Sequence, residues 1–459
     1  LFLLLVPYAL GILLADSVVP AEWVLFVGYV VSVVAIEFLD KYRPVVVMAV
    51  AFVVLGFGYM MTNLMRPTCD IPDGGYVEAV VTIDQIPVER NGYRLSYGKV
   101  EAWVSDSVLV ASDYDVVLWI RHDSVREGDR VQVHTKFNSR MSRFEPYDRL
   151  LRNRGYVGGM GIGNRGVVAI EHHDQMSLQN RAIRKLERYM RDSMSHSTAE
   201  AMVVGSRRLE PKTLREAYSR TGLSHLMALS GLHLGIVVIV IQMLLCPMVL
   251  IHHGNRMRNI MVIIVLWLYV ATSGASPSLV RAALMFSFLQ LAMASSKRYN
   301  SLNSLSAALF VMLIYRPNYL YDISFQLSAL AVIGIIVWGV PLMRRVAHYN
   351  TLVKMLLTTL IIGMAATLWT MPIVSHTFGN IPYLGVVVTP VAMLTAYAVV
   401  CCGIFALILP HPISLPFGWL MEQAARVQNG FVEWVAQWEW VTLNYQLSGV
   451  GAAIIYALF

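Results

Sequence analysis

Charged residues are scarce in this sequence, and their scarcity excludes an ordinary soluble enzyme. Asp, Glu, Lys and Arg make up 14% of the 459 residues, whereas hydrophobic residues make up 56%. Soluble domains average about 25% charged and about 45–50% apolar residues. The high apolar content also excludes a disordered chain. Four cysteines in a chain of this length are too few for a disulfide scaffold.

The sequence also lacks the short motifs that mark common catalytic sites. The patterns HExxH, GxSxG, GxxxxGK[ST], CxxC and HxHxDH do not occur in it. His172, His173 and Asp174 are adjacent, but a triplet of this kind in a loop is weak evidence for a metal site. We therefore expect no catalytic residue, no metal ion and no cofactor, and we expect that the protein is not an enzyme.

The charges that are present lie mostly in one third of the chain. Residues 66–220 hold 24 Lys and Arg and 21 Asp and Glu, which is 45 of the 65 charged residues. Apolar runs lie on both sides of this region. The alternation predicts a polytopic α-helical membrane protein with an inserted polar module. We assign four regions: N-terminal transmembrane helices at 1–65, the inserted module at 66–175, a basic connector at 176–220 and a membrane core at 221–459.

About eleven apolar segments are candidate membrane spans. Several are shorter than the roughly 20 residues that a straight spanning helix needs. Short spans occur where helices break or end at a protein-lined cavity. Because the chain starts without Met and both ends lie in apolar runs, we expect a piece of a longer protein. The expected spans are 1–15, 22–39, 45–62, 223–251, 259–273, 279–296, 301–315, 323–343, 353–374, 384–409 and 446–459.

Basic residues in the short loops predict an orientation. Loops on the cytoplasmic side of a membrane protein carry an excess of Lys and Arg. With the N-terminus inside, nearly all basic loops fall on that side and the module at 66–175 lies outside; Arg316 is the exception. The opposite loops at 16–20, 274–278 and 375–383 carry no Lys or Arg. The inside residues are Lys41, Arg43, Arg256, Arg258, Lys297, Arg298, Arg344, Arg345 and Lys354.

The inserted module reads as a small β-barrel. Its segments 76–87, 93–106, 108–122 and 130–138 alternate and are rich in Val, Tyr and Trp, which is typical of strands. About five strands in about 100 residues suggest a small barrel, and an OB-like barrel is one option. Such barrels often bind single-stranded nucleic acid through basic grooves and aromatic platforms.

A basic strip, residues 140–165, follows these strands. It is either a surface that binds the DNA backbone or a solvated connector, and the sequence leaves both open. Residues 177–192 form a basic amphipathic helix that suits anionic lipid, or alternatively nucleic acid. Residues 417–440, with four Trp, suggest an interfacial helix. The DNA-binding candidates of the strip are Arg140, Arg143, Arg149, Arg152 and Arg154.

The apolar core carries a few polar residues, concentrated in four stretches. In TGLSHLMALSGLHLGI (221–236), small residues that include Gly231 and Gly235 form one helical stripe, which favours close helix packing. Gly231 after Ser230 also suits a helix break at membrane depth. His225 and His233 lie on another face, where they either line a cavity or pack as satisfied core residues.

The other three stretches add polar groups at expected helix ends and breaks. Pro277 stands at a predicted helix start, and Arg281 one turn later either lines a path for phosphates or reaches the interface. Asp322 and Gln326 share a helix face. Asn380 lies in a proline-rich segment, 371–392, that suggests a broken helix. The pore-lining candidates are His225, Ser230, His233, Arg281, Asp322, Gln326 and Asn380.

These stretches together resemble the ComEC family of competence proteins. TGLSHLMALSGLHLGI is similar to the family's most distinctive membrane motif. SGASPSLVRAALM, the PNYLYDISFQLSALAVIGI run and the segment 371–392 resemble the next motifs in the same order. The segment 140–162 resembles the end of the family's OB-like domain, and PYALGILLAD resembles its first helix. The likeness covers almost the whole chain.

The resemblance implies an inner-membrane channel that imports single-stranded DNA during natural transformation. It implies a DNA-receptor protein outside and an ATP-driven motor or single-stranded-DNA-binding protein inside, because the sequence carries no ATP motif. Membrane lipid is a further expected partner. Many members carry a metallo-β-lactamase-like nuclease domain after the membrane core, so the resemblance implies either such a domain beyond Phe459 or a separate nuclease as a partner. Two alternatives stay open: a secondary transporter of a small anionic solute, and a membrane scaffold whose outer module binds a partner.

Overall fold

The structure is a computed structural model of the 459-residue chain. Its contacts divide the chain into two units, which are described separately. The first holds residues 3–176 and 310–322, and the second holds 177–309 and 323–459. The described residues are 2–17, 43–64, 69–84, 87–90, 93–105, 108–122, 124–142, 148, 151–152, 155–164, 166–172, 178–206, 210–250, 253–295 and 299–458.

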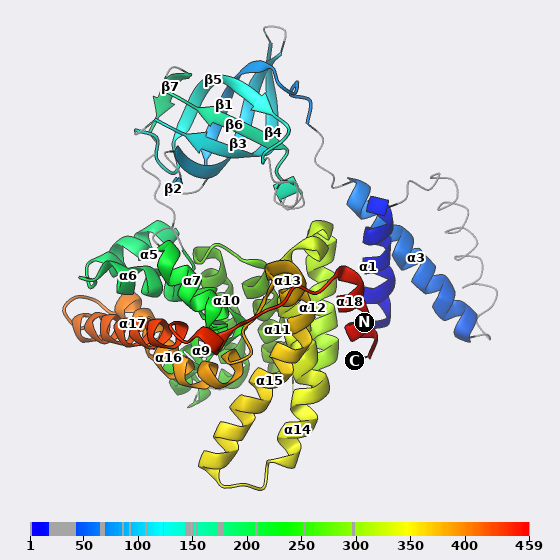
Figure 1. Cartoon of the computed structure of the whole chain (residues 1–459), viewed down its shortest axis with the longest axis vertical. Coiled ribbons are helices and arrows are strands. Elements are labelled where there is room, and N and C mark those ends of the chain that lie inside the picture. The colour runs from blue at the N-terminus through cyan, green and yellow to red at the C-terminus, as the bar shows by residue number, and fades with distance from the viewer. Residues whose placement is uncertain are drawn as a thin grey trace. The chain divides into compact units, whose positions relative to one another are not determined.

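Five strands of the first unit close into a barrel (Figure 1). They are β1 (Tyr76–Ile83), β3 (Tyr93–Ser105), β4 (Val108–Ile120), β5 (Arg130–Asn138) and β6 (Gly158–Ile162). The ring runs β1–β3–β4–β6–β5 and returns to β1. The β4–β6 pair is parallel and the other four are antiparallel. Two short strands extend the sheet: β2 (Val88–Arg90) pairs with β3, and β7 (Val167–Glu171) pairs with β5.

The alternation that predicted these strands also builds the interior of the barrel. Along β5 every second residue is buried, because successive side chains of a strand point to opposite faces. Val81, Val100, Leu118, Val131 and Met160, one from each ring strand, are completely buried in one apolar cluster. The predicted strands at 76–87, 93–106, 108–122 and 130–138 are confirmed, with shorter ends.

The sequence pattern missed β6, whose residues are Gly158-Gly-Met-Gly-Ile162. Its glycines serve close packing rather than a turn. A Cβ on Gly158 would lie 2.3 Å from the Phe137 ring, and one on Gly159 would lie 2.3 Å from the Trp119 ring. Only glycine therefore lets β6 approach both β5 and β4 and close the barrel.

Two apolar helices of the first unit pack closely on each other. They are α1 (Phe2–Ser17) and α3 (Arg43–Leu64). Gly11 of α1 lies against the backbone of Leu55, and Gly58 of α3 lies against the backbone of Tyr8. Small residues allow such close approach between helices in membranes. The predicted span at 22–39 lies outside the described residues.

The second unit is helical. The boundary between the two units falls within α12 (Ser301–Tyr315), after Leu309. The short turn η3 (Pro317–Tyr321) belongs to the first unit. The elements of the second unit are α5 (Leu178–Glu187), α6 (Ser193–Ala199), η1 (Glu200–Val204), α7 (Lys212–Arg220), α8 (Ser224–Met227), α9 (Gly231–Leu244), η2 (Cys246–Leu250), α10 (Gly254–Thr272), α11 (Pro277–Ala294), α13 (Ile323–Gly334), η4 (Ile335–Gly339), α14 (Val340–Arg345), α15 (Thr351–Phe378), β8 (Asn380–Ile381), α16 (Gly385–Ile408), α17 (Leu415–Ala436), η5 (Glu439–Val441), β9 (Leu443–Asn444) and α18 (Gly449–Leu458).

Four helices among the described residues are long and apolar enough to cross a membrane. They are Pro277–Ala294, Ile323–Arg345, Val353–Phe378 and Gly385–Ile408. Five further apolar helices are shorter, so the structure does not confirm eleven spans. Exposed apolar stripes support immersion in lipid, since water disfavours large apolar patches. On α15 this stripe consists of Leu356, Leu360, Met364 and Leu368, and on α10 it includes Ile260, Ile264 and Leu268.

Helix breaks in the second unit match the expected ones only in part. The single span expected at 223–251 is divided, because Ala228 and Ser230 adopt extended backbone between α8 and α9. The segment 371–392 is broken as expected, between Phe378 at the end of α15 and Gly385 at the start of α16, a stretch that includes Asn380 and Pro382. Two of its prolines do not break a helix, because α15 runs through Pro372 and α16 through Pro390. Neighbouring groups let membrane helices tolerate proline. The chain turns instead at Gly379, which has a φ of 69°.

The two amphipathic segments both form helices. The basic segment 177–192 forms α5, which buries Ile183 and Leu186. The segment 417–440 forms most of α17, whose buried face carries polar side chains as well as apolar ones, Gln428 and Asn429 among them. Trp419, Trp434 and Trp440 are exposed, so the interfacial position of this segment stays a prediction.

Candidate functional site

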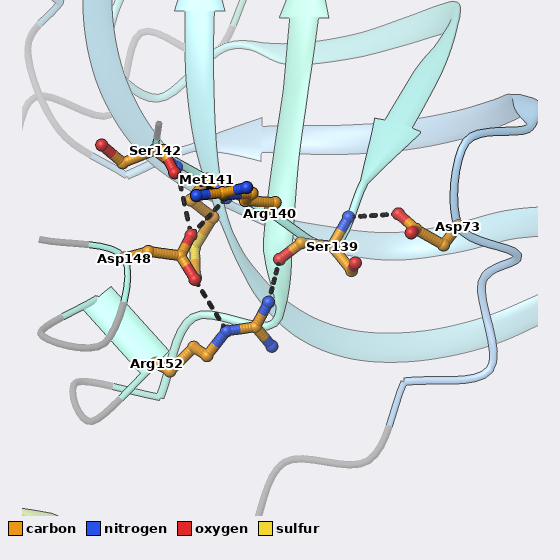
Figure 2. A network of polar contacts seen from close by, with 7 residues as sticks. All are labelled: Asp73, Ser139, Arg140, Met141, Ser142, Asp148 and Arg152. Atoms are coloured by element: carbon orange, nitrogen blue, oxygen red, sulfur yellow. Dashed lines mark hydrogen bonds and ion pairs between the residues drawn. The ribbon is translucent and has the colours of Figure 1, made fainter. Parts of the chain in front are cut away.

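The arginine-rich strip forms the connection between β5 and β6, and Asp148 organises its described part. One carboxylate oxygen, Oδ1, accepts the backbone N–H groups of Met141 at 2.6 Å and Ser142 at 3.1 Å. The other, Oδ2, accepts Nε of Arg152 at 3.0 Å. Figure 2 shows both halves of this arrangement, which we call the Asp148 clip. Asp148 itself is buried, with 8% of the residue exposed, whereas the Arg152 side chain is 47% exposed.

Arg152 also ties the connection to the end of β5. Its Nη2 donates to the carbonyl oxygen of Ser139 at 2.6 Å, and the Ser139 N–H donates to Oδ1 of Asp73 at 2.6 Å (Figure 2). This arginine therefore holds the connection in place. Arg140 is exposed, and its Nε donates to the carbonyl oxygen of Ser142 at 3.1 Å. The other candidates, Arg143, Arg149 and Arg154, lie outside the described residues.

The pKa of the Asp148 carboxyl reflects a balance in which hydrogen bonding prevails. Partial burial opposes ionisation and raises the pKa, but the hydrogen bonds from Arg152, Met141 and Ser142 favour the carboxylate. The net pKa lies below the ordinary value for Asp. Asp148 is therefore ionised at neutral pH and holds the connection through charge-assisted hydrogen bonds.

Aromatic side chains lie on the outer surface of β3 and β4, next to the same connection. Tyr97 and Tyr156 pack with ring centroids 5.0 Å apart. With Leu95 and Trp119 they are partly buried against a small apolar cluster formed by Val117, Met141 and Leu151. The barrel core lies on the opposite face of these strands. This aromatic patch therefore combines ring faces with a neighbouring basic connection.

In the second unit, Ser230 and His233 define the start of α9. The Ser230 N–H donates to Nδ1 of His233 at 3.2 Å, and the Ser230 hydroxyl lies 2.9 Å from the same nitrogen. Because a backbone N–H only donates, Nδ1 is an acceptor and the ring is neutral with its proton on Nε2. His233 is completely buried, and its Nε2 has no hydrogen-bond partner among the described residues.

His225 lies on the other side of the helix break. Its Nδ1 is 3.0 Å from the carbonyl oxygen of Gly222, and the residue is exposed. Gly222 has a φ of 74°, a conformation that glycine adopts without strain. A Cβ at this position would also meet Pro382, so the turn before α8 lies against the loop before α16. The two histidines thus flank the break between α8 and α9.

Arg281 is buried near the start of α11. The helix has Ser276 as its N-cap residue and Pro277 in its first turn, as predicted, but the Ser276 side chain makes no capping hydrogen bond. Arg281 is 5% exposed, and its Nε and Nη1 have no hydrogen-bond partner among the described residues. A buried guanidinium of this kind is costly unless an anion pairs with it.

The remaining candidates are separate from this group. Asp322 belongs to the first unit and is buried, whereas Gln326 lies half-buried on α13 of the second. Asn380 is in β8, whose backbone pairs with β9 at Asn444. The structure brings Ser230 and His233 into contact, and it brings Gly231 of α9 to Ala282 of α11.

Sequence reasoning missed a buried polar cluster between α6, α7 and α17. Oδ1 of Asn429 accepts the hydroxyls of Thr198 at 2.8 Å and Tyr218 at 3.0 Å. Oε1 of Glu422 accepts the backbone N–H groups of Arg191 and Asp192 at 3.1 and 3.2 Å. The available signal was that α17 places polar residues on the face that it buries. This cluster joins helices that are distant in sequence.

The fold and these sites define a class of protein: a helical membrane protein whose helical core accompanies a five-stranded barrel with a basic connection. The chain belongs to the Competence protein family, whose model matches residues 202–459. The matched region includes the α8–α9 break and Arg281. No solved structure matches the chain.

Two curated relatives are similar to parts of the chain. ComE operon protein 3 of Bacillus subtilis (strain 168) is 32% identical over 134 residues, which are 29% of this chain and 17% of the relative. An uncharacterized protein of Aquifex aeolicus (strain VF5) is 25% identical over 236 residues, or 51% of this chain and 53% of the relative. The matches thus span a sixth and about half of the relatives' lengths.

Proposed function

We propose that this chain is the core of an inner-membrane channel that imports single-stranded DNA during natural transformation. Its membership of the Competence family supports a role in DNA uptake. The observation that carries the proposal is the arginine-bearing β5–β6 connection beside the aromatic patch on the barrel. A membrane transporter of small solutes does not need such a surface.

The barrel suits a strand of nucleic acid at the expected place. OB-like barrels bind oligonucleotides on the face of their second and third strands and on the loop between the fourth and fifth. In the ring of this protein those strands are β3 and β4, and that loop is the β5–β6 connection. The aromatic rings of Tyr97, Trp119 and Tyr156 lie on this face. Stacking and backbone charge would together hold a strand without reading its sequence.

The helical core suits a path through which a DNA strand passes rather than a site that binds it tightly. A polyanion stalls in a path lined by many cations, so conduction requires weak, separated sites. The core has few charges, and the pore-lining residues that we propose are mostly uncharged residue types: His225, Ser230, His233, Gln326 and Asn380, with Asp322 as the acidic residue and Arg281 as the cation. The driving force would come from an ATP-driven motor or a single-stranded-DNA-binding protein inside, and a receptor and a nuclease would act with the channel outside.

A secondary transporter of a small anionic solute is the second candidate. The specific observation that favours it is the discontinuous α8–α9 segment, because transporters place half-helix ends at their substrate sites. The two proposals differ in their demands on the barrel. Reversing the charge of Arg140 in the β5–β6 connection should weaken DNA import and leave the flux of a small anion unchanged.

The test measures labelled DNA that becomes DNase-resistant in cells lacking the gene. Wild type, Arg140→Glu and the control Lys136→Glu are each reintroduced; Lys136 is exposed on the neighbouring strand β5. We expect deletion to abolish import, and wild type and Lys136→Glu to restore it. Arg140→Glu should lower import several-fold, with a defect that becomes smaller at higher salt, because salt weakens the phosphate contact that the variant has lost. Normal import in the deletion strain would refute the channel and favour the transporter.

A further inference from the structure

Two helices of the membrane core run in the same direction from neighbouring starts. A Cβ on Gly231 would lie 3.2 Å from the Cβ of Ala282, and one on Gly235 would lie 3.5 Å from Cζ of Phe286. The contacts advance by four residues on α9 and by four on α11, so the two helices are parallel. Because Gly231 is the first residue of α9, that helix begins at the level of Ala282, next to Arg281.

The intervening helix confirms this arrangement. The Nε1 of Trp267 in α10 donates to Oγ of Ser287 in α11 at 3.1 Å. The Nε of Arg256, near the start of α10, donates to the carbonyl oxygen of Ala294, the last residue of α11, at 3.4 Å. α10 therefore runs antiparallel to α11 and connects two helices that start at the same end.

Each helix start exposes backbone donors. The first four N–H groups of a helix have no partner within it, and the aligned peptide dipoles place about half a positive charge there. At α11, Pro277 lacks an N–H and the buried Oγ of Ser276 has no hydrogen-bond partner among the described residues. At α9, the Ser230–His233 contact fixes the position of the first turn. Two positive helix ends thus lie near each other.

Arg281 supplies a full charge at this point. It follows Ser278 by three residues, so both lie on one face of α11, and long side chains of a helix lean toward its N-terminus. The Ser278 hydroxyl lies 2.7 Å from that of Ser328 on α13, which brings a third helix to the same turn. Arg281 is thus a nine-tenths buried cation that leans toward a helix start and whose Nε and Nη1 have no partner in the described part of the chain.

We propose that the starts of α9 and α11, together with Arg281, form a binding site for one phosphate group. Two helix ends and a guanidinium match a compact anion with several acceptor oxygens. The assignment of the phosphate to the backbone of a passing DNA strand rests on the proposed function. A single site of this kind would hold each phosphate briefly, as conduction requires. A lipid headgroup carries the same chemistry and is distinguished by the test.

The test uses the full chain, purified in a maltoside detergent, and measures its melting temperature. Inorganic phosphate, a short oligothymidylate and a soluble short-chain phosphatidylglycerol are titrated at constant ionic strength. The variants are Arg281→Met, Arg281→Lys and the control Arg344→Met, since Arg344 is exposed on α14. Without ligand we expect Arg281→Met to melt at the wild-type temperature or above, because it removes a desolvated charge whose Nε and Nη1 have no partner among the described residues.

With phosphate we expect wild type and Arg344→Met to gain stability in a saturable way. Arg281→Met should bind at least about tenfold more weakly, the loss expected for one charge-assisted hydrogen-bonding group. Arg281→Lys should keep part of the response. A stronger effect of oligothymidylate than of phosphatidylglycerol would assign the site to nucleic acid, and the reverse would assign it to lipid.

The outcomes separate the site from the channel. If wild type and Arg281→Met respond alike, or if neither responds to any of the three probes, the site is refuted whatever DNA import shows. A large loss of ligand-free stability in Arg281→Met and Arg281→Lys would mean that Arg281 has a structural partner, which also refutes it. If the gene deletion leaves DNA import normal, the channel fails while an Arg281-dependent response to phosphate still establishes the anion site.

Discussion

Asp148 shows how a single carboxylate sets the form of the basic connection. It accepts hydrogen bonds from two backbone N–H groups and one guanidinium N–H, and all three donors lie at most seven residues from Asp148 in the sequence. Hydrogen bonds to a charged group contribute about 1.5–3 kcal/mol each when the group is largely buried. Without the Asp148 clip, the connection would lose its attachment to the end of β5, and Arg152 would lose its fixed position.

We expect Asp148→Asn to loosen this connection in the folded chain. Amide hydrogen exchange at Met141 should become about tenfold faster, since an amide oxygen accepts these bonds more weakly than a carboxylate. The matched control is Asp113→Asn, because the Asp113 side chain is 79% exposed and its ion pair with Lys99 is on the surface. Equal protection of Met141 in wild type and Asp148→Asn would show that the clip contributes nothing.

The same clip predicts a pH dependence with a definite sign. The pKa of Asp148 is lower in the folded protein than the ordinary value of about 4, so its stabilising effect is fully present above that value. The effect is lost as the pH falls through the folded pKa. Met141 protection, corrected for intrinsic exchange, should therefore fall below about pH 4 in wild type and stay flat in Asp148→Asn.

At the residue scale, the sequence could predict the strip of arginines but not their contacts within the protein. Arg152 donates hydrogen bonds to Ser139 and Asp148, and its role in DNA binding stays a prediction. A basic sequence pattern shows where positive charge lies but not which carboxylate each arginine contacts. The contact between Ser230 and His233 was likewise not predicted, because it depends on an extended backbone at Ser230.

At the element scale, the closure of the barrel depends on β6, and its glycines can be tested. Gly159 lies against the Trp119 ring, whereas a Cβ on Gly161 would meet nothing within 4 Å. Gly159→Val should separate β6 from β4 at a cost of about 1–3 kcal/mol or more, because the strand has no room to move. Gly161→Val, the control, should change stability by less than about 0.5 kcal/mol.

Hydrogen exchange along β4 measures this effect in the full chain. Residues Val116–Ile120 pair with β6 in parallel register, so their amides report the closure. We expect faster exchange there in Gly159→Val and wild-type rates in Gly161→Val. Equal rates in the two variants would mean that the approach of β6 to Trp119 does not limit closure.

Periodicity in the sequence predicted the strands whose own alternating residues determine which face is buried. The four alternating strands have one face in the core, so their pattern is visible in the sequence. β6 has no such alternation, since two of its three glycines, Gly158 and Gly159, are required by Phe137 and Trp119 on the neighbouring strands. The division between α8 and α9 was indicated by Ser230 and Gly231, but an apolar run alone predicted one long helix. Pro372 does not end a helix, because α15 continues through it.

At the scale of the whole molecule, the family and the general architecture were predictable, whereas the number of spans was not. Composition separates the membrane regions from the polar module, and the motif-rich stretches between 221 and 392 lie within the family match. A count of spans needs helix lengths, which depend on where each helix breaks. Four described helices satisfy the length criterion, and several of the others end early at turns such as the one at Ser230.

The orientation of the chain is a property of the whole molecule and gives the last prediction. The basic loop at Arg344, Arg345 and Lys354 should lie in the cytoplasm by the positive-inside rule, and the barrel should lie outside. Single cysteines at Val168, which is 60% exposed on β7, and at Tyr349, which is 49% exposed, sample the two sides. The four native cysteines would first be replaced by serine.

An impermeant maleimide applied to intact spheroplasts should label Val168→Cys and should reach Tyr349→Cys only after permeabilisation. The physical reason is that short loops rich in Lys and Arg resist translocation across the membrane. A long module of mixed charge such as the barrel can be translocated largely regardless of its charge. The barrel's position therefore follows from the basic loops and from the number of crossings between them. Labelling of Tyr349→Cys in intact spheroplasts, with Val168→Cys protected, would show that the chain has the opposite orientation in the membrane. The arginine-bearing connection would then face the cytoplasm, where it would meet a strand after the membrane rather than before it.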